Sequence, residues 1–201
     1  MLLYEIKKMK EKILITCFEP FGGEEKNSSM AVAEALPAEL AGREAVKLIL
    51  PVEFARAAEI AEAKARETGA KYIISLGQAG ARSSVTPELV AINLNHAAIP
   101  DNAGKNPKDE PIAEGGSMAY FTRFPARLLA AKINEYGVPS ALSYSAGAYV
   151  CNDLYYRLLA AFEKEDVTVL FVHVPREKND VSAEKMAFAL EKALEDIFKR
   201  A

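Results

Sequence analysis

A cysteine that could act as a nucleophile lies where a small, flexible turn leads into a helix-like pattern. Ser145-Ala146-Gly147 comes shortly before Cys151, and apolar side chains recur at helical spacing after it. Main-chain N–H groups at a helix start favour negative charge, so a thiol held there is expected to ionise more readily. Because the thiolate is the nucleophile, this placement predicts a cysteine-dependent hydrolase. A buried cysteine that only fills the core is the competing interpretation.

Two further residues could complete the chemistry. His173 closes an otherwise apolar run and is the candidate base, which takes the thiol proton and later gives it to the leaving amine. A third group must hold the imidazole ring, and Glu88 is the candidate by position, with Asp101 as the alternative. The competing interpretations are a core histidine bonded to a carbonyl and a glutamate that only caps a turn. Cys17 is expected to pack in the core, and His96 to lie at the surface.

The elements that must position these residues alternate between strands and helices. Short apolar runs predict strands, and stretches with helical periodicity between caps predict helices. The expected strands are 12–18, 46–50, 72–76 (ended by Gly77), 141–144 and 167–174, and the expected helices are 28–36, 54–67, 125–136, 149–163 and 182–199. Residues 85–99 are expected to be extended, with a possible hairpin, and 100–116 to form a long loop that acts as a lid or a subunit contact.

This alternation predicts an α/β fold: a single-domain α/β/α sandwich with a mostly parallel, mixed central sheet. The catalytic domain is expected to span residues 12–201, after an N-terminal extension of residues 1–11 in which Met9 is a possible true start. Sites in open α/β sheets form beyond the carboxyl ends of the parallel strands. The side chains that would meet at that edge are Phe18, Glu19, Phe21, Gln78, Arg82, Glu88, Cys151 and His173.

Composition excludes several classes of function. The 201 residues carry a net charge of −3 without the basic stripe that binds nucleic acid. No apolar run approaches the ~20 residues of a membrane span, and no export signal is recognised. Two cysteines and two histidines without metal-binding spacing predict no metal site, and a Cys17–Cys151 disulfide is the weaker interpretation. We therefore expect a cytoplasmic protein that binds neither nucleic acid nor membrane.

Six sequence blocks resemble one family of cysteine peptidases. They are Phe18-Glu19-Pro20-Phe21-Gly22-Gly23, Gly77-Gln78-Ala79-Gly80-Ala81-Arg82, Pro87-Glu88-Leu89-Val90-Ala91-Ile92-Asn93, Ile99-Pro100-Asp101-Asn102, Ser145-Ala146-Gly147-Ala148-Tyr149-Val150-Cys151-Asn152 and His173-Val174-Pro175. In this order they resemble the pyrrolidone carboxyl peptidases (pyroglutamyl peptidase type I), from about Lys12 to the C-terminus. The resemblance implies a cysteine exopeptidase that removes N-terminal pyroglutamyl residues from peptides, through an acyl-enzyme and without a cofactor.

The resemblance also implies a role for particular residues. It implies a triad of Cys151, His173 and Glu88, and homo-oligomers, either tetramers or dimers. The substrate pocket that it implies is formed by Phe18, Phe21, Gln78, Ile99, Tyr149 and Val150. Pyroglutamate is a neutral lactam, so apolar walls and a few hydrogen-bonding groups suit it better than an acidic residue would.

Some positions depart from the family pattern. Cys17 replaces a usual glycine, Tyr144 replaces a usual asparagine, and residues 176–180 form a short charged segment that puts the leaving-group side of the site in doubt. Two other functions stay open at this point. One is another thiol-dependent amidohydrolase, like the glutamine amidotransferases, and the other is a non-catalytic homologue that keeps the fold for assembly or ligand binding.

Overall fold

The central sheet determines where the candidate residues lie. The computed structural model describes residues 10–177 and 181–199. Within them, one sheet has the strand order β2-β3-β1-β4-β8-β5. The bounds are β1 (Lys12–Phe18), β2 (Glu39–Leu40), β3 (Arg43–Leu50), β4 (Tyr72–Gln78), β5 (Thr86–Pro87) and β8 (Thr168–Val174). Strands β3, β1, β4 and β8 run parallel, and β2 and β5 add antiparallel edges, so the predicted mixed, mostly parallel sheet is confirmed.

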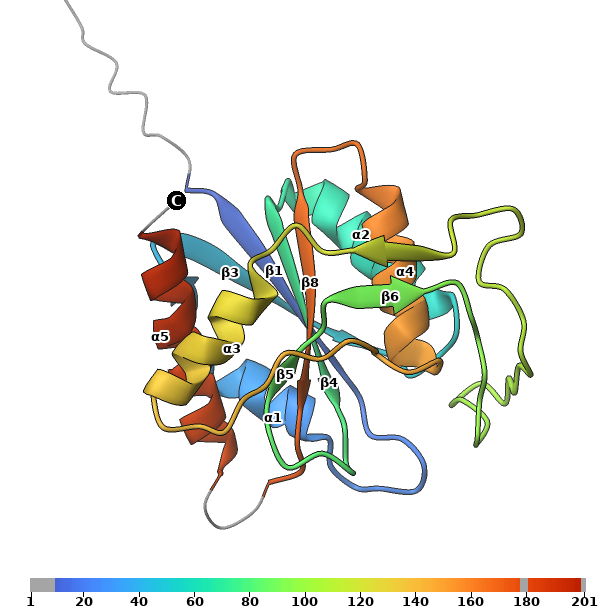
Figure 1. Cartoon of the computed structure of the whole chain (residues 1–201), viewed down its shortest axis with the longest axis horizontal. Helices are drawn as coiled ribbons and strands as arrows, with labels where there is room; N and C mark the ends of the chain where they lie inside the picture. Colours follow the sequence, from blue (N-terminus) through green and yellow to red (C-terminus); the bar gives the residue numbers. More distant parts are fainter. Residues whose placement is uncertain (1–9, 178–180, 200–201) are drawn as a thin grey trace, which may run out of the picture.

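Helices cover both faces of this sheet. One layer consists of α1 (Ser28–Ala35), α3 (Ala126–Glu135) and α5 (Ala183–Phe198), and the other of α2 (Arg56–Thr68) and α4 (Val150–Ala161) (Figure 1). Successive residues of a strand point to opposite faces. Along β1, Ile13 and Ile15 accordingly join the core under α1, α3 and α5, whereas Leu14 joins the core under α2 and α4. The predicted α/β/α sandwich is confirmed.

Local sequence signals explain where two helices begin and end. Asn27 caps α1, because its side chain accepts a hydrogen bond from the main-chain N–H of Ser29 at 3.0 Å. Gly69 ends α2 in the left-handed conformation (φ +66°), which glycine adopts without a Cβ penalty. Both boundaries agree with the sequence analysis.

The expected strand at 141–144 is wrong, and a proline gives the reason. The segment runs beside residues 85–89: the N–H of Ala141 donates to Val85, and that of Ser143 donates to Pro87. A parallel ladder would also need an N–H at Pro87, which proline lacks. Only isolated bridges therefore remain, Val85 with Ser140 and Glu88 with Ser143.

The possible hairpin within residues 85–99 is also wrong. Strand β6 (Val90–Ile92) pairs antiparallel with β7 (Ala119–Phe121), which follows the long loop instead of preceding it. The two strands lie apart from the main sheet, beside α4 (Figure 1). Residues 100–116 form the predicted loop between them, and their role as lid or subunit contact stays a prediction.

The beginning of the described chain is attached to the sheet. Most of the expected extension, residues 1–11, lies outside the described residues. Lys10 forms an ion pair with Glu39, and Glu11 forms one with Arg43 at 2.9 Å. In the described part of the chain, no helix combines the length and the apolar character needed to cross a membrane.

Candidate active site

Cys151 lies in the first turn of α4, as predicted. The preceding turn uses Gly147 at φ +82°, a conformation that side-chain-bearing residues rarely adopt. Its N–H donates to the Ser145 hydroxyl at 3.2 Å. After this turn, Val150 is completely buried, whereas Cys151 is half-buried and lines a cavity.

The end of β4 brings the sulfur beside the strand that carries the histidine. Strand β4 continues through Gly77, beyond the expected end, and Gly77 is the Cα partner of His173 on β8. A Cβ at position 77 would lie 3.0 Å from the Cys151 Sγ and 2.6 Å from the Phe171 ring. Only glycine leaves room for the Cys151 sulfur at this position of β4. Because Gly77 is also paired with His173, Cys151 and His173 lie near the same residue of the sheet, and both line the same cavity.

His173 is held by Glu88, the partner preferred in the sequence analysis. The His173 Nδ1 and the Glu88 Oε1 are 2.7 Å apart, and both side chains are buried. Glu88 is fixed through its main chain as well: its N–H donates to Phe171 at 2.8 Å, and its carbonyl accepts from the Tyr155 hydroxyl at 2.9 Å. The Nδ1 of the imidazole therefore contacts a carboxylate whose residue is held in place by β8 and α4.

The carboxylate of Asp101, the alternative partner of His173, instead accepts hydrogen bonds from main-chain N–H groups. Its carboxylate accepts hydrogen bonds from the N–H groups of Phe54 (2.9 Å), Ala103 (3.0 Å) and Lys105 (2.7 Å). Asp101 is also buried, so these bonds compensate for the water that it loses. Its contacts fix the start of the long loop and do not include the histidine.

Burial controls the protonation of the candidate pair. It raises the pKa of the Cys151 thiol to about 12, with Glu88 acting in the same direction and Arg82 and the N–H of Cys151 opposing. The expectation of a more readily ionised thiol is therefore wrong, because desolvation outweighs the helix start. Burial also lowers the pKa of the His173 imidazole, against the hydrogen bond and charge of Glu88. Both shifts favour the neutral thiol and the neutral imidazole.

The cavity beside this pair is mainly apolar. Its volume is about 420 Å³, within the range of small-molecule sites. It is lined by Phe18, Phe21, Asn27, Val52, Gln78, Ala79, Arg82, Ser145, Ala146, Gly147, Tyr149, Val150, Cys151 and His173. These lining residues include no carboxylate, so the cavity suits a ligand without an amino-group charge.

Aromatic rings form one wall of the cavity. Tyr149 packs against Phe21 at 6.2 Å between centroids and edge-on against Phe54 at 5.3 Å. Its hydroxyl donates to the Pro100 carbonyl at 3.1 Å, which ties this wall to the long loop. Of the predicted pocket residues, Ile99 is the exception: it is 45% exposed and is not among the lining residues.

Comparison with known proteins decides the family. A family model described as pyroglutamyl peptidase matches residues 11–197. The chain belongs to the pyroglutamyl peptidase family. Among its relatives, a pyrrolidone-carboxylate peptidase of Lactobacillus johnsonii is 42% identical over 82% of this chain and 77% of the relative, and one of Thermococcus onnurineus is 43% identical over 82% and 83%.

Solved structures of this peptidase family share the fold. The pyrrolidone carboxyl peptidase of Thermococcus litoralis superposes with a TM-score of 0.88 at 31% identity, covering 95% of this chain and 94% of that one. The pyroglutamyl peptidase I of Bacillus amyloliquefaciens gives a TM-score of 0.86 at 35% identity, covering 94% and 98%. The resemblance found in the sequence is therefore confirmed.

Gln78 lines the cavity, and hydrogen bonds at both ends of its amide fix its orientation. Its Oε1 accepts from both the N–H (2.8 Å) and the hydroxyl (3.0 Å) of Ser28, at the start of α1. Its Nε2 donates to Glu24 at 2.9 Å, and Glu24 also pairs with Arg176 from the charged segment after β8. Residues 178–180 of that segment lie outside the described residues.

Asn27 and Arg82 are polar residues that line the cavity but were not assigned a role in it from the sequence. The only sequence signal for Asn27 is its place just before the helix expected at 28–36, and Arg82 was expected only among the side chains at the carboxyl edge of the sheet. The signal for Arg82 was its place in the same block as Gln78, but its contacts could not be read from the sequence. Arg82 donates to the Glu88 carboxylate and thus belongs to the site.

Cys17 and His96 lie where they were expected, whereas Glu19 accepts a hydrogen bond from the Asn102 amide at 2.7 Å and is not among the residues that line the cavity. Cys17 is buried in the core, and burial raises the pKa of its thiol to about 12. Both Cys17 and Cys151 are free thiols. His96 is exposed and pairs with Asp109 at 2.8 Å. Within the described residues, no three His, Cys, Asp or Glu side chains gather as metal ligands would.

Proposed function

We propose that this chain hydrolyses the amide bond after an N-terminal pyroglutamyl residue, with Cys151 as nucleophile, His173 as base and acid, and Glu88 as the group that orients His173. The 2.7 Å contact between the His173 Nδ1 and Glu88, on the cavity that Cys151 lines, is the observation that carries the proposal. Membership of the pyroglutamyl peptidase family supports the substrate class.

The first half of the reaction forms an acyl-enzyme. The neutral His173 takes the thiol proton as the Cys151 Sγ attacks the pyroglutamyl carbonyl, and the Glu88 carboxylate stabilises the imidazolium that forms. First-turn N–H groups of α4 have no partner within the helix, so the N–H of Cys151 can donate to the developing oxyanion. The C–N bond then breaks, and the imidazolium gives its proton to the leaving amine.

The second half regenerates the thiol. Water attacks the thioester while His173 takes one of its protons, and the C–S bond breaks with return of that proton to sulfur. Pyroglutamate leaves as the free acid. The net reaction consumes one water and needs no cofactor.

The cavity explains how the ring would be selected. Its phenylalanine and tyrosine walls, Phe18, Phe21 and Tyr149, match the flat apolar faces of the ring. The lactam N–H and C=O need polar partners, and a proline ring, which lacks the lactam carbonyl, would leave such partners unpaired. An N-terminal glutamate would bring an ammonium charge, and the lining residues include no carboxylate to neutralise it.

Release of a chromophore from three amides tests this function. Pyroglutamyl amide should be cleaved, with kcat/KM higher than for prolyl or glutamyl amide by about 10⁴-fold, the discrimination expected when a buried polar group loses its partner. A chain that prefers the prolyl or glutamyl amide, or cleaves none of the three, would contradict the proposed substrate.

The orienting role of Glu88 predicts a graded loss. Glu88→Gln should lower kcat by about 10²-fold, less than the loss of the nucleophile or the base, because the imidazole stays but its ring is less well held. Asp101→Asn is the matched control, since it also exchanges a buried carboxylate for an amide. It should lower the melting temperature and leave kcat nearly unchanged. The opposite pattern, an unchanged rate in Glu88→Gln and a slow Asp101→Asn, would assign the role to Asp101.

We also propose that the chain acts in the cytoplasm as a homodimer or homotetramer. Two large apolar side chains near β7, Met118 (83% exposed) just before the strand and Phe121 (63% exposed) at its end, support association with a second copy. The mass of the purified chain by light scattering tests the assembly, and a monomer over the whole concentration range would exclude it.

A further inference from the structure

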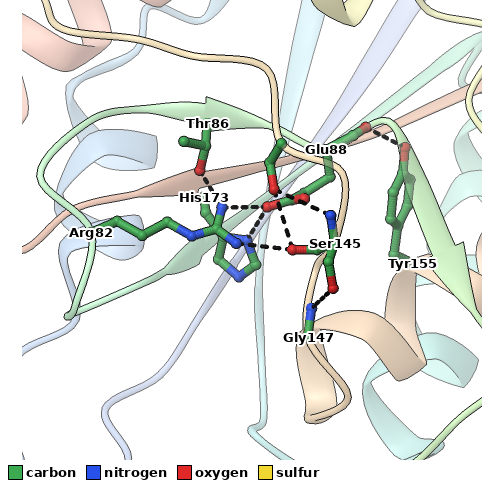
Figure 2. Close-up of polar contacts among 8 residues, drawn as sticks. Arg82, Thr86, Glu88, Ser145, Gly147, Tyr155 and His173 are labelled. Atoms are coloured by element: carbon green, nitrogen blue, oxygen red, sulfur yellow. Dashed lines mark hydrogen bonds and ion pairs between the residues drawn. The ribbon is translucent and has the colours of Figure 1, made fainter.

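The guanidinium of Arg82 connects two parts of the site that come from distant segments. Arg82 lies in the loop between β4 and β5, where its N–H donates to Ala79 at 2.9 Å. Its side chain extends back over the sheet edge toward Glu88 and the turn before α4 (Figure 2). It is 27% exposed, whereas the Glu88 side chain is completely buried.

One end of the guanidinium is bonded to the carboxylate that holds the histidine. Arg82 Nη1 is 2.5 Å from Glu88 Oε1, the same oxygen that lies 2.7 Å from His173 Nδ1, and it also donates to the Thr86 hydroxyl. The second carboxylate oxygen, Oε2, is buried and has no hydrogen-bond partner within the described residues. The arginine and the histidine therefore share one oxygen of a single buried charge.

The other end is bonded to the turn that carries the nucleophile. Arg82 Nη2 donates to the Ser145 carbonyl at 2.9 Å, a group that also accepts from the Ser143 hydroxyl at 3.2 Å. The Ser145 hydroxyl in turn accepts from the Gly147 N–H, four residues before Cys151. Figure 2 shows the guanidinium between these two sets of bonds.

We propose that Arg82 is a positioning residue, which bridges the Glu88 carboxylate to the Ser145 carbonyl and so fixes the Glu88–His173 pair relative to the turn that carries Cys151. The inference rests on the proposed function of this site and adds a residue to it. Arg82 does not contact the reacting atoms in this scheme; it acts through Glu88 and through the turn.

The charges around His173 explain why the contacts of Arg82 affect the protonation of the imidazole as well as its position. The charged groups that act on the imidazole are Glu88 and Arg82, and the titratable thiol of Cys151 lines the same cavity. Without Arg82, the buried Glu88 carboxylate would have only the imidazole as a cationic partner, and a buried unpaired charge is costly. The imidazole would then be held protonated, and a protonated imidazole cannot act as the base. In agreement, the charge of Arg82 lowers the pKa of both His173 and Cys151.

Steady-state kinetics of two variants test the proposal. Arg82→Met should lower kcat on a pyroglutamyl amide by about 10²-fold, the loss expected for misplaced groups, with little change in KM. The acid limb of its kcat/KM profile should move to higher pH, because removal of the cation raises the imidazole pKa. Arg82→Lys keeps the positive charge, but a single ammonium group cannot bond the Glu88 carboxylate and the Ser145 carbonyl at the same time. This variant should therefore keep the acid limb of the wild type, whereas its kcat should stay reduced.

An NMR titration gives a readout that does not need activity. The sequence contains two histidines, so a His96→Gln background leaves His173 as the single imidazole signal. That signal should titrate at higher pH in Arg82→Met than in the parent. If the wild type cleaves no pyroglutamyl amide, the proposed function fails, and this titration still decides the inference about Arg82.

Arg123→Met is the matched control. Arg123 also donates to main-chain carbonyls, those of Phe162 (3.4 Å) and Glu165 (2.7 Å), but it does not line the active-site cavity. The Arg123→Met variant should be less stable than the parent, whereas its kcat and the pH at which His173 titrates should be unchanged. The proposal would be overturned if Arg82→Met kept the kcat of the wild type. It would also be overturned if Arg82→Met were slow but its acid limb and its His173 titration were both unchanged. If Arg82→Met does not fold, wild-type kcat in Arg82→Lys would overturn it.

Discussion

Replacing Cys151 by serine should abolish turnover of a pyroglutamyl amide and leave the fold intact. We expect kcat to fall by at least about 10⁴-fold, because the hydroxyl is a far weaker nucleophile and the other groups cannot replace it. The substitution exchanges one atom at the edge of a cavity, so it leaves no large void in the core. Circular dichroism and the melting temperature should stay close to those of the parent.

Cys17→Ser is the control for that experiment. Cys17 is 2% exposed, and its Sγ lies 3.8 Å from the Leu48 carbonyl, away from the cavity. Its replacement puts a hydroxyl into the core and should lower stability, whereas kcat should stay near that of the parent. Near-full activity in Cys151→Ser, or loss of activity only in Cys17→Ser, would place the nucleophile elsewhere.

Replacing His173 by glutamine should lower kcat by about 10³-fold and remove the acid limb of the pH profile. A base works while it is unprotonated, and burial keeps the pKa of this imidazole below its ordinary value. The parent should therefore keep its kcat/KM as the pH falls through about 6.5, the usual imidazole value, and lose it only at lower pH. The glutamine variant has no group at this position that titrates in that range.

The pH profile of kcat/KM from about pH 4 to pH 9 checks the sign of this effect. An acid limb at or above the ordinary imidazole pKa would mean that the charge of Glu88 outweighs burial, and that the resting pair is charged. A limb that persists in His173→Gln would show that another group is the base.

Much of the fold could be predicted because its signals are local. Asn27 and Gly69 mark helix ends by chemistry that involves only neighbouring residues, and the apolar run at 167–174 needs no partner to be recognised. The strand expected at 141–144 failed because Pro87, more than fifty positions away, removes the donor that its ladder needs. The pairing of β6 with β7 likewise depends on the path of the long loop between them, which brings residues 119–121 back beside residues 90–92.

In the candidate site, the positions of the key residues could be predicted from the sequence, whereas their surroundings could not. Cys151 and His173 could be placed because each lies in an element that the sequence predicts, the start of a helix and an apolar strand, whereas Glu88 was chosen by its position alone. The protonation of Cys151 was predicted with the wrong sign, since a helix start can be seen in a sequence and the loss of water around a side chain cannot. Ile99 and Arg82 show the same limit: a block of sequence does not say which side chains reach the cavity.

The central claim is that the Cys151 sulfur attacks the pyroglutamyl carbonyl carbon in the cavity beside His173. Incubation with a pyroglutamyl diazomethyl ketone, which alkylates the attacking thiol, followed by mass spectrometry of the peptides, tests it directly. We expect one pyroglutamyl adduct on the peptide that contains Cys151, loss of activity in proportion to that adduct, and protection by substrate. An adduct on Cys17, or full inactivation with Cys151 unmodified, would contradict it.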